Sequence, residues 1–325
     1  MGQPFDFGLF DCLLCEVAGI LPYEMHVDIN AAIKAADAIR PLAEHLGIPA
    51  PHPHLYGFSY CQVATMGGRI LNGPELKEPA VEPCLASPAD IDKLTEPRDY
   101  LAHPIVQQRL ELVRQLQARR PDAGTRIGHD FEGPVTTAAL LLGGQTFFML
   151  PYDDPGRAHK LLEFCLRGSL NYCRAIRKLQ GRPFGGQPEG VPDDFGGMFG
   201  PSLFGEFVAA YWEKLYAGLS ASVRYLHCEL LHPEHLPWLA ELKIDEYDSG
   251  VDQYLPPETV QQACPVPYTL RIWPSMVQSQ SAQELVALYR RLAACKPQSI
   301  SFHLERLKDL PKIEALLKVA RELEK

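Results

Sequence analysis

The stretch YLHCELLHPEHLP, residues 225–237, concentrates side chains that can bind metals or move protons. It holds three histidines, one cysteine and two glutamates. If its first part is a β-strand, side chains alternate between two faces, so His227 and Glu229 share one face and Cys228 takes the other. A histidine beside a carboxylate can hold zinc or act as an acid–base pair. The alternative interpretation is a charged loop after a strand.

A catalytic zinc ion usually takes three protein ligands, so this pair needs one more donor. His303, in the stretch SISFHL, is the strongest candidate because it also lies near the end of a predicted strand. We therefore predict a zinc site formed by His227, Glu229 and His303. The lone C-x-x-C at Cys12 and Cys15 lacks the second pair of a zinc ribbon, and we interpret it as two buried thiols.

Acidic residues gather at the ends of two other predicted strands. In IDEYDSGV, we expect Tyr247 and Asp248 to reach a central cavity. In RIGHDFEGP, Asp130 precedes a Gly-Pro turn that opens a helix, and helix N-termini favour nearby anions. We predict Asp248, Asp130 and Tyr247 as the residues that orient the substrate or act in catalysis.

Two further stretches leave their role open. PDDFGGMFGP offers Asp193 and Asp194 in a glycine-rich loop, where they could act in a site or cap and stabilise turns. HPHLYGFSYCQVATMGGRI, residues 52–70, mixes aromatic residues with a Gly-Gly turn. It could line a pocket for a flat apolar ligand or form a strand and loop with core aromatics.

Predicted strands and amphipathic helices alternate along the whole chain. The predicted helices include residues 29–49, 103–121, 154–181 and 200–220. Regular alternation favours a parallel sheet or barrel. We predict a single domain over residues 1–325, a (β/α)8 TIM-type barrel with an N-terminal extension, and a doubly wound sheet is the runner-up. In such a barrel the carboxyl ends of the strands carry the chemistry.

Composition narrows the classes of function. The chain has 325 residues, a formal net charge of −9 and 46 % apolar residues. Nucleic-acid binding needs clustered Lys or Arg, so we expect no nucleic-acid partner. We expect no signal peptide and no transmembrane helix, because no apolar run approaches the required length. Nine cysteines without a secretion signal indicate reduced thiols and a cytoplasmic location.

Several motifs resemble those of one known superfamily. These are GPVTTAALLLGGQTFFMLPYDDPGRAHKLLEFC, PDDFGGMFGPSLFGEFVAAYWEKL and VEPCLASPADIDKLTEP. They resemble the Gly-Pro-x-Thr helix, the segment around Ser-Pro-x-x-Phe and the Ser-Pro-x-Asp connector of the uroporphyrinogen decarboxylase superfamily. The matches run in order from about residue 30 to the end of the chain. The resemblance implies a (β/α)8 barrel.

That superfamily contains tetrapyrrole decarboxylases, which need no cofactor, and zinc-dependent methyltransferases that work with corrinoid proteins. The decarboxylases carry an N-terminal Arg-rich motif, but the first basic residue here is Lys34 and the first arginine is Arg40. The resemblance is therefore closer to the methyltransferases. It places His227 at their zinc histidine, Glu229 at their first zinc cysteine and His303 near the later one.

A zinc ion held by histidine and carboxylate is more Lewis-acidic than one held by thiolates, and it suits an oxygen substrate. The resemblance thus implies methyl transfer between a small methylated, O-methyl compound and a corrinoid protein or thiol. Zinc and a methyl-corrinoid on a partner protein would be the cofactors. A cofactor-free decarboxylase and a non-catalytic corrinoid-binding barrel are the alternatives. The sequence does not fix the oligomeric state, and a homodimer is one option.

Overall fold

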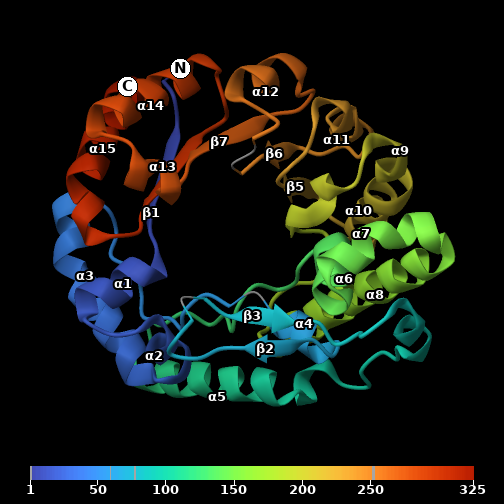
Figure 1. Ribbon diagram of the computed structural model, residues 1–325. Helices are drawn as coiled ribbons and strands as arrows, with labels where there is room; N and C mark the ends of the chain where they lie inside the picture. Colours follow the sequence, from blue (N-terminus) through green and yellow to red (C-terminus); the bar gives the residue numbers. More distant parts are fainter. Residues whose placement is uncertain (1, 59, 77, 251–252) are drawn as a thin grey trace.

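The computed structural model describes residues 2–58, 60–76, 78–250 and 253–325, and its centre is a curled parallel β-sheet (Figure 1). Six described strands follow the order β1-β8-β7-β6-β5-β4, and every pair is parallel. The strands of this sheet are β1 (Phe5–Leu9), β4 (Pro188–Pro192), β5 (Val223–His227), β6 (Glu246–Asp248), β7 (Tyr268–Ile272) and β8 (Ile300–Leu304). β2 (Arg69–Leu71) and β3 (Ala80–Glu82) form a separate antiparallel pair.

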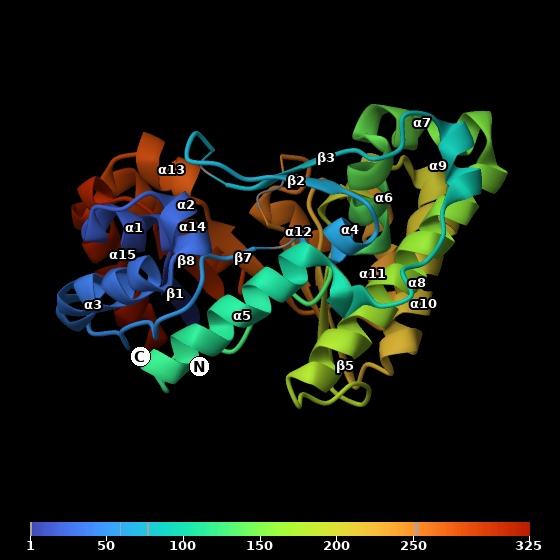
Figure 2. The ribbon, with the colours of Figure 1, turned by 90° about the horizontal axis from the view of Figure 1, so that it is seen from below.

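Helices follow the strands and surround the sheet (Figures 1 and 2). In the first half they are α1 (Asp11–Ala18), α2 (Pro22–Val27), α3 (Ile29–Leu46), α4 (Cys61–Thr65), η1 (Pro88–Lys93), η2 (Tyr100–Ala102), α5 (Pro104–Arg119), α6 (Pro134–Leu142) and α7 (Gly144–Asp153). In the second half they are α8 (Pro155–Leu179), η3 (Asp194–Met198), α9 (Pro201–Phe204), η4 (Gly205–Ala209), α10 (Ala210–Leu219), η5 (Pro233–His235), α11 (Pro237–Glu241), α12 (Pro257–Ala263), α13 (Pro274–Ser279), α14 (Ala282–Ala294), η6 (Leu307–Asp309) and α15 (Leu310–Glu324).

The predicted helices at residues 29–49, 103–121 and 154–181 are confirmed as α3, α5 and α8. The helix expected over residues 200–220 is present but interrupted, because a π-helical turn, η4, separates α9 from α10. No described helix has the length and apolar character needed to cross a bilayer.

Two extended stretches, 53–58 and 124–133, stand where a closed barrel would have its second and third strands. Their backbones make scattered hydrogen bonds, including His129 N to Phe58 O at 3.2 Å and Gly133 N to Pro192 O at 2.7 Å. The described residues of neither stretch form a regular ladder, so the structure shows an α/β fold with six curled parallel strands. The eight-stranded barrel is thus confirmed only in part.

A buried arginine joins these two stretches from outside. α5 crosses this side of the molecule (Figures 1 and 2), and its Arg109 is only 5 % exposed. The guanidinium donates to Ile127 O in one stretch and to Tyr56 O, at 2.9 Å, in the other. Gly128 has a φ of +155°, and a Cβ there would lie 2.0 Å from Phe58 O. Glycine therefore permits the close approach that Arg109 stabilises.

The predicted N-terminal extension is corrected by the structure. β1 begins at Phe5 and pairs with β8 along its whole length, from Phe5 opposite Ile300 to Leu9 opposite Leu304. Gln3 N also donates to Leu323 O at 2.8 Å, next to the other end of the described chain. The first residues are thus part of the sheet, because an apolar-polar alternation in FDFGL lets one face pack and the other face the interior.

The cysteines are all free thiols, and the structure describes each of them. Cys15 is buried with its Sγ 3.7 Å from Met25 Sδ, and Cys12 Sγ lies 3.5 Å from Glu305 O. Burial, followed by nearby carboxylates, raises the pKa of both thiols to about 12. Such thiols are poor nucleophiles at neutral pH. Cys15 is buried as predicted, whereas Cys12 is only partly buried.

Asp193 caps helix α6 from a distant part of the chain. It is fully buried and accepts hydrogen bonds from Thr136 N at 2.6 Å, Val135 N at 3.3 Å and Trp212 Nε1 at 2.7 Å. Burial raises its pKa to about 6 against the lowering effect of these donors. The carboxylate fits because residue 133 has no side chain: a Cβ there would lie 2.2 Å from Asp193 Cγ.

Gly133→Ala is therefore expected to lower the free energy of unfolding by about 3 kcal/mol, since neither the cap nor the helix can move freely. Gly200→Ala is the matched control. Both glycines precede a helix-opening proline with nearly the same backbone angles, φ −62° and ψ 162° against φ −64° and ψ 160°. A Cβ at residue 200 meets nothing within 4 Å. Urea unfolding of both variants checks the prediction, and equal effects would contradict it.

Candidate functional site

Side chains on the inner face of the sheet line a cavity of about 580 Å³, here called the lumen pocket. TIM barrels commonly fill this space with layers of branched apolar side chains. Here mostly polar residues point inward, which leaves room for a ligand. The polar lining residues are Asp6, Tyr225, His227, Glu246, Asp248, Thr269, Arg271, Ser299, Ser301 and His303.

Four charged side chains form a continuous line at the carboxyl ends of β4 to β7, and we call Asp194, His227, Asp248 and Arg271 the charge line. His227 and Asp248 are direct neighbours across β5 and β6. His227 Nδ1 lies 3.0 Å from Asp248 Oδ2, and its Nε2 lies 3.2 Å from Asp194 Oδ1. Arg271 Nε donates to Asp248 Oδ1 at 2.9 Å, and its Nη2 contacts the other oxygen.

The alternating charges shift the pKa values of the central pair. Burial alone would lower the pKa of His227, but its contacts with Asp194 and Asp248 outweigh burial and raise it to about 9. Burial alone would raise the pKa of Asp248, but His227 and Arg271 hold it at about 2. At neutral pH the line therefore contains an imidazolium between two carboxylates, which can serve as a proton donor.

This pair makes stability depend on pH with a definite sign. The pKa of His227 rises from 6.5 to about 9 on folding, so its contribution is complete below the lower value and is lost as pH rises through the upper one. Because a quarter of the side chain is exposed, we expect a loss of about 2 kcal/mol. Urea unfolding at about pH 6 and about pH 10 measures it. The advantage of the wild type over His227→Gln should shrink at high pH, and a constant difference would contradict this.

The other two predicted zinc ligands lie apart from this line. His303 lines the lumen pocket, stacks on Phe10 with ring centroids 4.6 Å apart, and has its pKa lowered by burial and by Arg271. Glu229 does not share a strand face with His227, because β5 ends at His227 and the chain turns at Leu230, which has a φ of +61°. The Glu229 side chain packs against the backbone at residue 250 instead, and it is not among the residues lining the pocket.

The predicted zinc set is consequently not assembled. The described part of the chain contains no group of three or more His, Cys, Asp or Glu residues placed to hold a metal ion. Both ring nitrogens of His227 face carboxylates, whereas a zinc ligand must be a neutral imidazole with a free lone pair. Zinc binding by His227, Glu229 and His303 stays a prediction that this arrangement does not favour.

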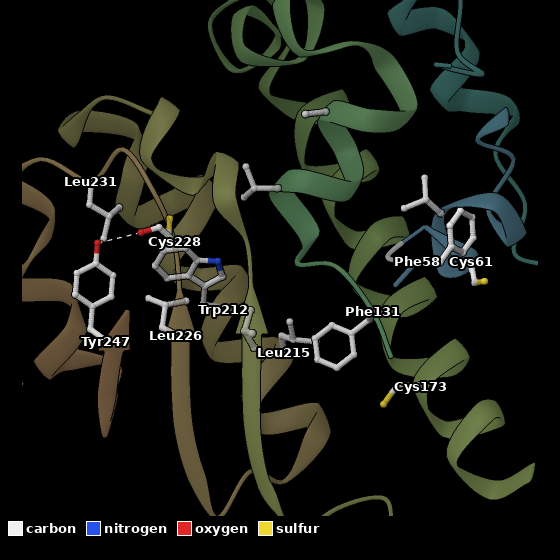
Figure 3. Packing of buried hydrophobic residues seen from close by; sticks show 14 of the residues in the cluster. Phe58, Cys61, Phe131, Cys173, Trp212, Leu215, Leu226, Cys228, Leu231 and Tyr247 are labelled. Atoms are coloured by element: carbon white, nitrogen blue, oxygen red, sulfur yellow. Dashed lines mark hydrogen bonds between the residues drawn. The ribbon is translucent and has the colours of Figure 1, made fainter. Parts of the chain in front are cut away.

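Tyr247 does not reach the cavity, contrary to our expectation. It is fully buried, and its hydroxyl donates to Cys228 O at 3.0 Å, in the packed layer that also contains Trp212 and Leu226 (Figure 3). In the short strand β6, Asp248 faces the lumen, so its neighbour Tyr247 must face the surrounding helices. The side chain therefore stabilises the fold and holds the loop after β5 in place.

Asp130 belongs to a buried ion cluster rather than to the lumen pocket. Its carboxylate accepts from Arg177 Nε at 2.8 Å and Arg182 Nη1 at 2.7 Å. Arg177 also donates to both carboxylate oxygens of Glu189, at 2.5 and 2.8 Å. Burial would raise the pKa of Asp130, but the two arginines lower it. These contacts fasten the stretch 124–133 to β4 and α8, and a catalytic role of Asp130 stays a prediction.

The loop PDDFGGMFGP resolves into one structural and one candidate functional residue. Asp193 is the helix cap described above, whereas Asp194, one residue later, lies beside His227 in the charge line. Sequence alone left the roles of both aspartates open, because capping and ligand binding favour the same residue type. Arg271 was not predicted as a site residue. The signal was present in YTLRI, where Thr269 and Arg271 alternate with three buried apolar residues.

A second cavity, of about 450 Å³, adjoins the lumen pocket at Phe10, and we call it the aromatic pocket. It lies beside the ends of β1 and β8. Its lining residues are Leu9, Phe10, Asp11, Cys12, Tyr56, Gly57, Phe58, Tyr60, Glu78, Pro79, His129 and Glu305. The stretch 52–70 thus lines a pocket, and its aromatic residues also pack in the core. Binding of a flat apolar ligand there stays a prediction.

Comparison with known proteins places the chain in a family. The family model described as Uroporphyrinogen decarboxylase (URO-D) matches residues 59–266, well over half of the chain. Among solved structures, a methyltransferase from Methanosarcina mazei has the same fold, with a TM-score of 0.72 and 17 % identity over 99 % of this chain and 94 % of that chain. A search of curated proteins found no match. The chain belongs to the uroporphyrinogen decarboxylase family.

Proposed function

We propose that the protein moves a methyl group between a small O-methyl compound and a corrinoid protein or thiol acceptor. The observation that carries the proposal is the charge line, which holds a protonated histidine at the edge of a polar cavity. The methyl group of an O-methyl compound is hard to transfer because the oxygen anion that departs is a poor leaving group. An acid that protonates this oxygen as the bond breaks lowers the barrier.

Each member of the charge line has a part in this reaction. The acceptor attacks the methyl carbon, the carbon–oxygen bond breaks with its electrons on oxygen, and His227 gives that oxygen its Nε2 proton. Asp248 keeps the ring oriented through Nδ1, while Arg271 keeps Asp248 ionised. In this step the substrate oxygen takes the place of Asp194 Oδ1, which lies 3.2 Å from Nε2.

The lumen pocket favours this reaction over tetrapyrrole decarboxylation. Asp6, Glu246 and Asp248 all line it, and Arg271 is the only lysine or arginine among the described residues that line it. The Nε and Nη2 groups of Arg271 already contact Asp248. A substrate with many carboxylates needs several fixed cations, and this cavity would repel it. A small neutral donor meets no such barrier.

The test is an assay with defined probes. The protein is incubated with cob(I)alamin and either methanol or 2-methoxyphenol, and methylcobalamin formation is followed by absorbance. The reverse direction uses methylcobalamin and coenzyme M. Turnover above the protein-free rate supports the proposal. Release of CO₂ from uroporphyrinogen would favour the decarboxylase, and cobalamin binding without turnover in any assay would favour a non-catalytic barrel.

Metal content provides a separate prediction. Because the described residues assemble no three-donor group, we expect freshly purified, chelator-free protein to contain far less than equimolar zinc by elemental analysis. His227→Ala should leave that content unchanged. Equimolar zinc in the wild type that is lost in His227→Ala would instead support a site containing His227, and the acid mechanism would be abandoned.

A further inference from the structure

The aromatic pocket has walls of a kind that the proposed reaction does not use. Phe10, Tyr56, Phe58 and Tyr60 contribute rings from the end of β1 and from the stretch before α4. Phe58 and Tyr60 meet edge to face, with centroids 6.3 Å apart and planes at 77°. The faces of aromatic rings carry partial negative charge, so a group of rings around a cavity attracts cations.

Carboxylates add full negative charge to the same cavity. Glu78 and Glu305 line it, and the described residues include no ion-pair partner for either side chain. Glu305 accepts a hydrogen bond from the neutral amide of Gln278, at 2.6 Å. Asp11 is different, because it pairs with His54 Nε2 and accepts from Gly57 N, both at 2.7 Å. Asp11 therefore holds the loop, and the two glutamates supply the uncompensated charge.

The described residues that line the aromatic pocket include no lysine or arginine. Arg306 lines an adjoining cavity that Glu78 and Glu305 also border. Arg109 lies over the Phe58 ring, 5.0 Å from its centre, but its buried guanidinium donates to Ile127 O and Tyr56 O and is not among the residues that line the cavity. The charge of His54 is taken up by Asp11. The cavity thus presents rings and two carboxylates to whatever enters.

We propose that the aromatic pocket binds the ammonium group of a small organic cation, with methyl groups on nitrogen facing the rings. Acidic side chains alone would attract any cation, but the aromatic wall selects for one that sheds water easily. A bare metal ion needs converging oxygen ligands, which this wall does not offer. The inference goes beyond the proposed methyl transfer and concerns a separate cavity.

Isothermal titration with three probes at constant ionic strength tests the proposal: tetramethylammonium, ammonium and the neutral tert-butanol. Tetramethylammonium is expected to bind at least about tenfold more tightly than the other two, which corresponds to about 1.4 kcal/mol. Glu305→Gln and Glu78→Gln are each expected to weaken tetramethylammonium binding about fivefold. Glu241→Gln, an exposed glutamate on α11, is the matched control and should bind like the wild type.

Each other outcome overturns the proposal. Equal binding of tert-butanol would show a neutral apolar pocket, and equal binding of ammonium would show that the carboxylates act without the rings. Unchanged affinity in both glutamate variants would place the cation elsewhere. Because these titrations involve no turnover, their failure would leave the methyl-transfer assay unaffected, and the reverse also holds.

Discussion

His227→Gln is expected to lower the rate of methyl transfer by about 10³-fold, the usual size of a general acid contribution. Glutamine can still hydrogen-bond to Asp248 but has no proton to give at neutral pH. The wild-type rate should also fall as pH rises through about 9, where His227 loses its proton, and the variant should lack this step. Rates of methylcobalamin formation across this pH range provide the measurement.

His303→Gln is the comparison that separates acid catalysis from zinc catalysis. His303 lines the same lumen pocket but contacts neither carboxylate of the charge line. If His227 acts as an acid, loss of His303 should cost less than about tenfold. A loss of similar size in both variants, accompanied by loss of bound zinc, would contradict the acid mechanism.

Arg177→Met is expected to lower the free energy of unfolding by about 3–5 kcal/mol, because it removes the cation that pairs with buried Glu189 and leaves Asp130 with Arg182 alone. Arg177 is 8 % exposed, Glu189 only 2 % and Asp130 12 %. The methionine chain replaces the apolar stem of the arginine but cannot neutralise either acid. Urea unfolding at neutral pH measures the change.

Arg114→Met is the matched control for this prediction. Arg114 makes the same two-pronged contact with Glu111, at 2.8 and 2.6 Å, but the side chains are 70 % and 48 % exposed. An exposed pair of this kind contributes about 0.5 kcal/mol. Equal destabilisation by the two substitutions would show that burial is not the source of the effect.

The alternation of side chains along strands and the spacing of polar residues predicted part of the candidate site. His227, Asp248 and His303 were placed at strand ends facing a cavity, and all three line it. Glu229 was misplaced because a strand pattern does not reveal where the strand stops, and β5 stops two residues earlier. Tyr247 was misplaced because both it and Asp248 were expected to reach the cavity, whereas neighbouring residues of a strand face opposite ways.

Long-range charge pairing was the part that the sequence could not supply. In the sequence, Asp130 and Asp248 look alike as acidic residues at predicted strand ends. In the structure, Asp130 pairs with two arginines outside the lumen pocket, whereas Asp248 pairs with His227 inside it. Arg177 and Arg182 come some fifty positions after Asp130, on α8 and beyond its end. Only the folded chain brings these charges together, so their roles separate only in the structure.

The stretches 53–58 and 124–133 form the wall of the molecule between β1 and β4, and the way in which this wall is held affects its local opening. Arg109, Arg177 and Arg182 hold it largely through side chains, whereas β7 and β8 are joined by a parallel ladder. Backbone amides in 124–132 should therefore exchange with solvent by local opening, at a lower free-energy cost than those of the ladder. The aromatic pocket touches this wall at Tyr56 and His129. A ligand bound there would slow the opening, so amide exchange would report its occupancy.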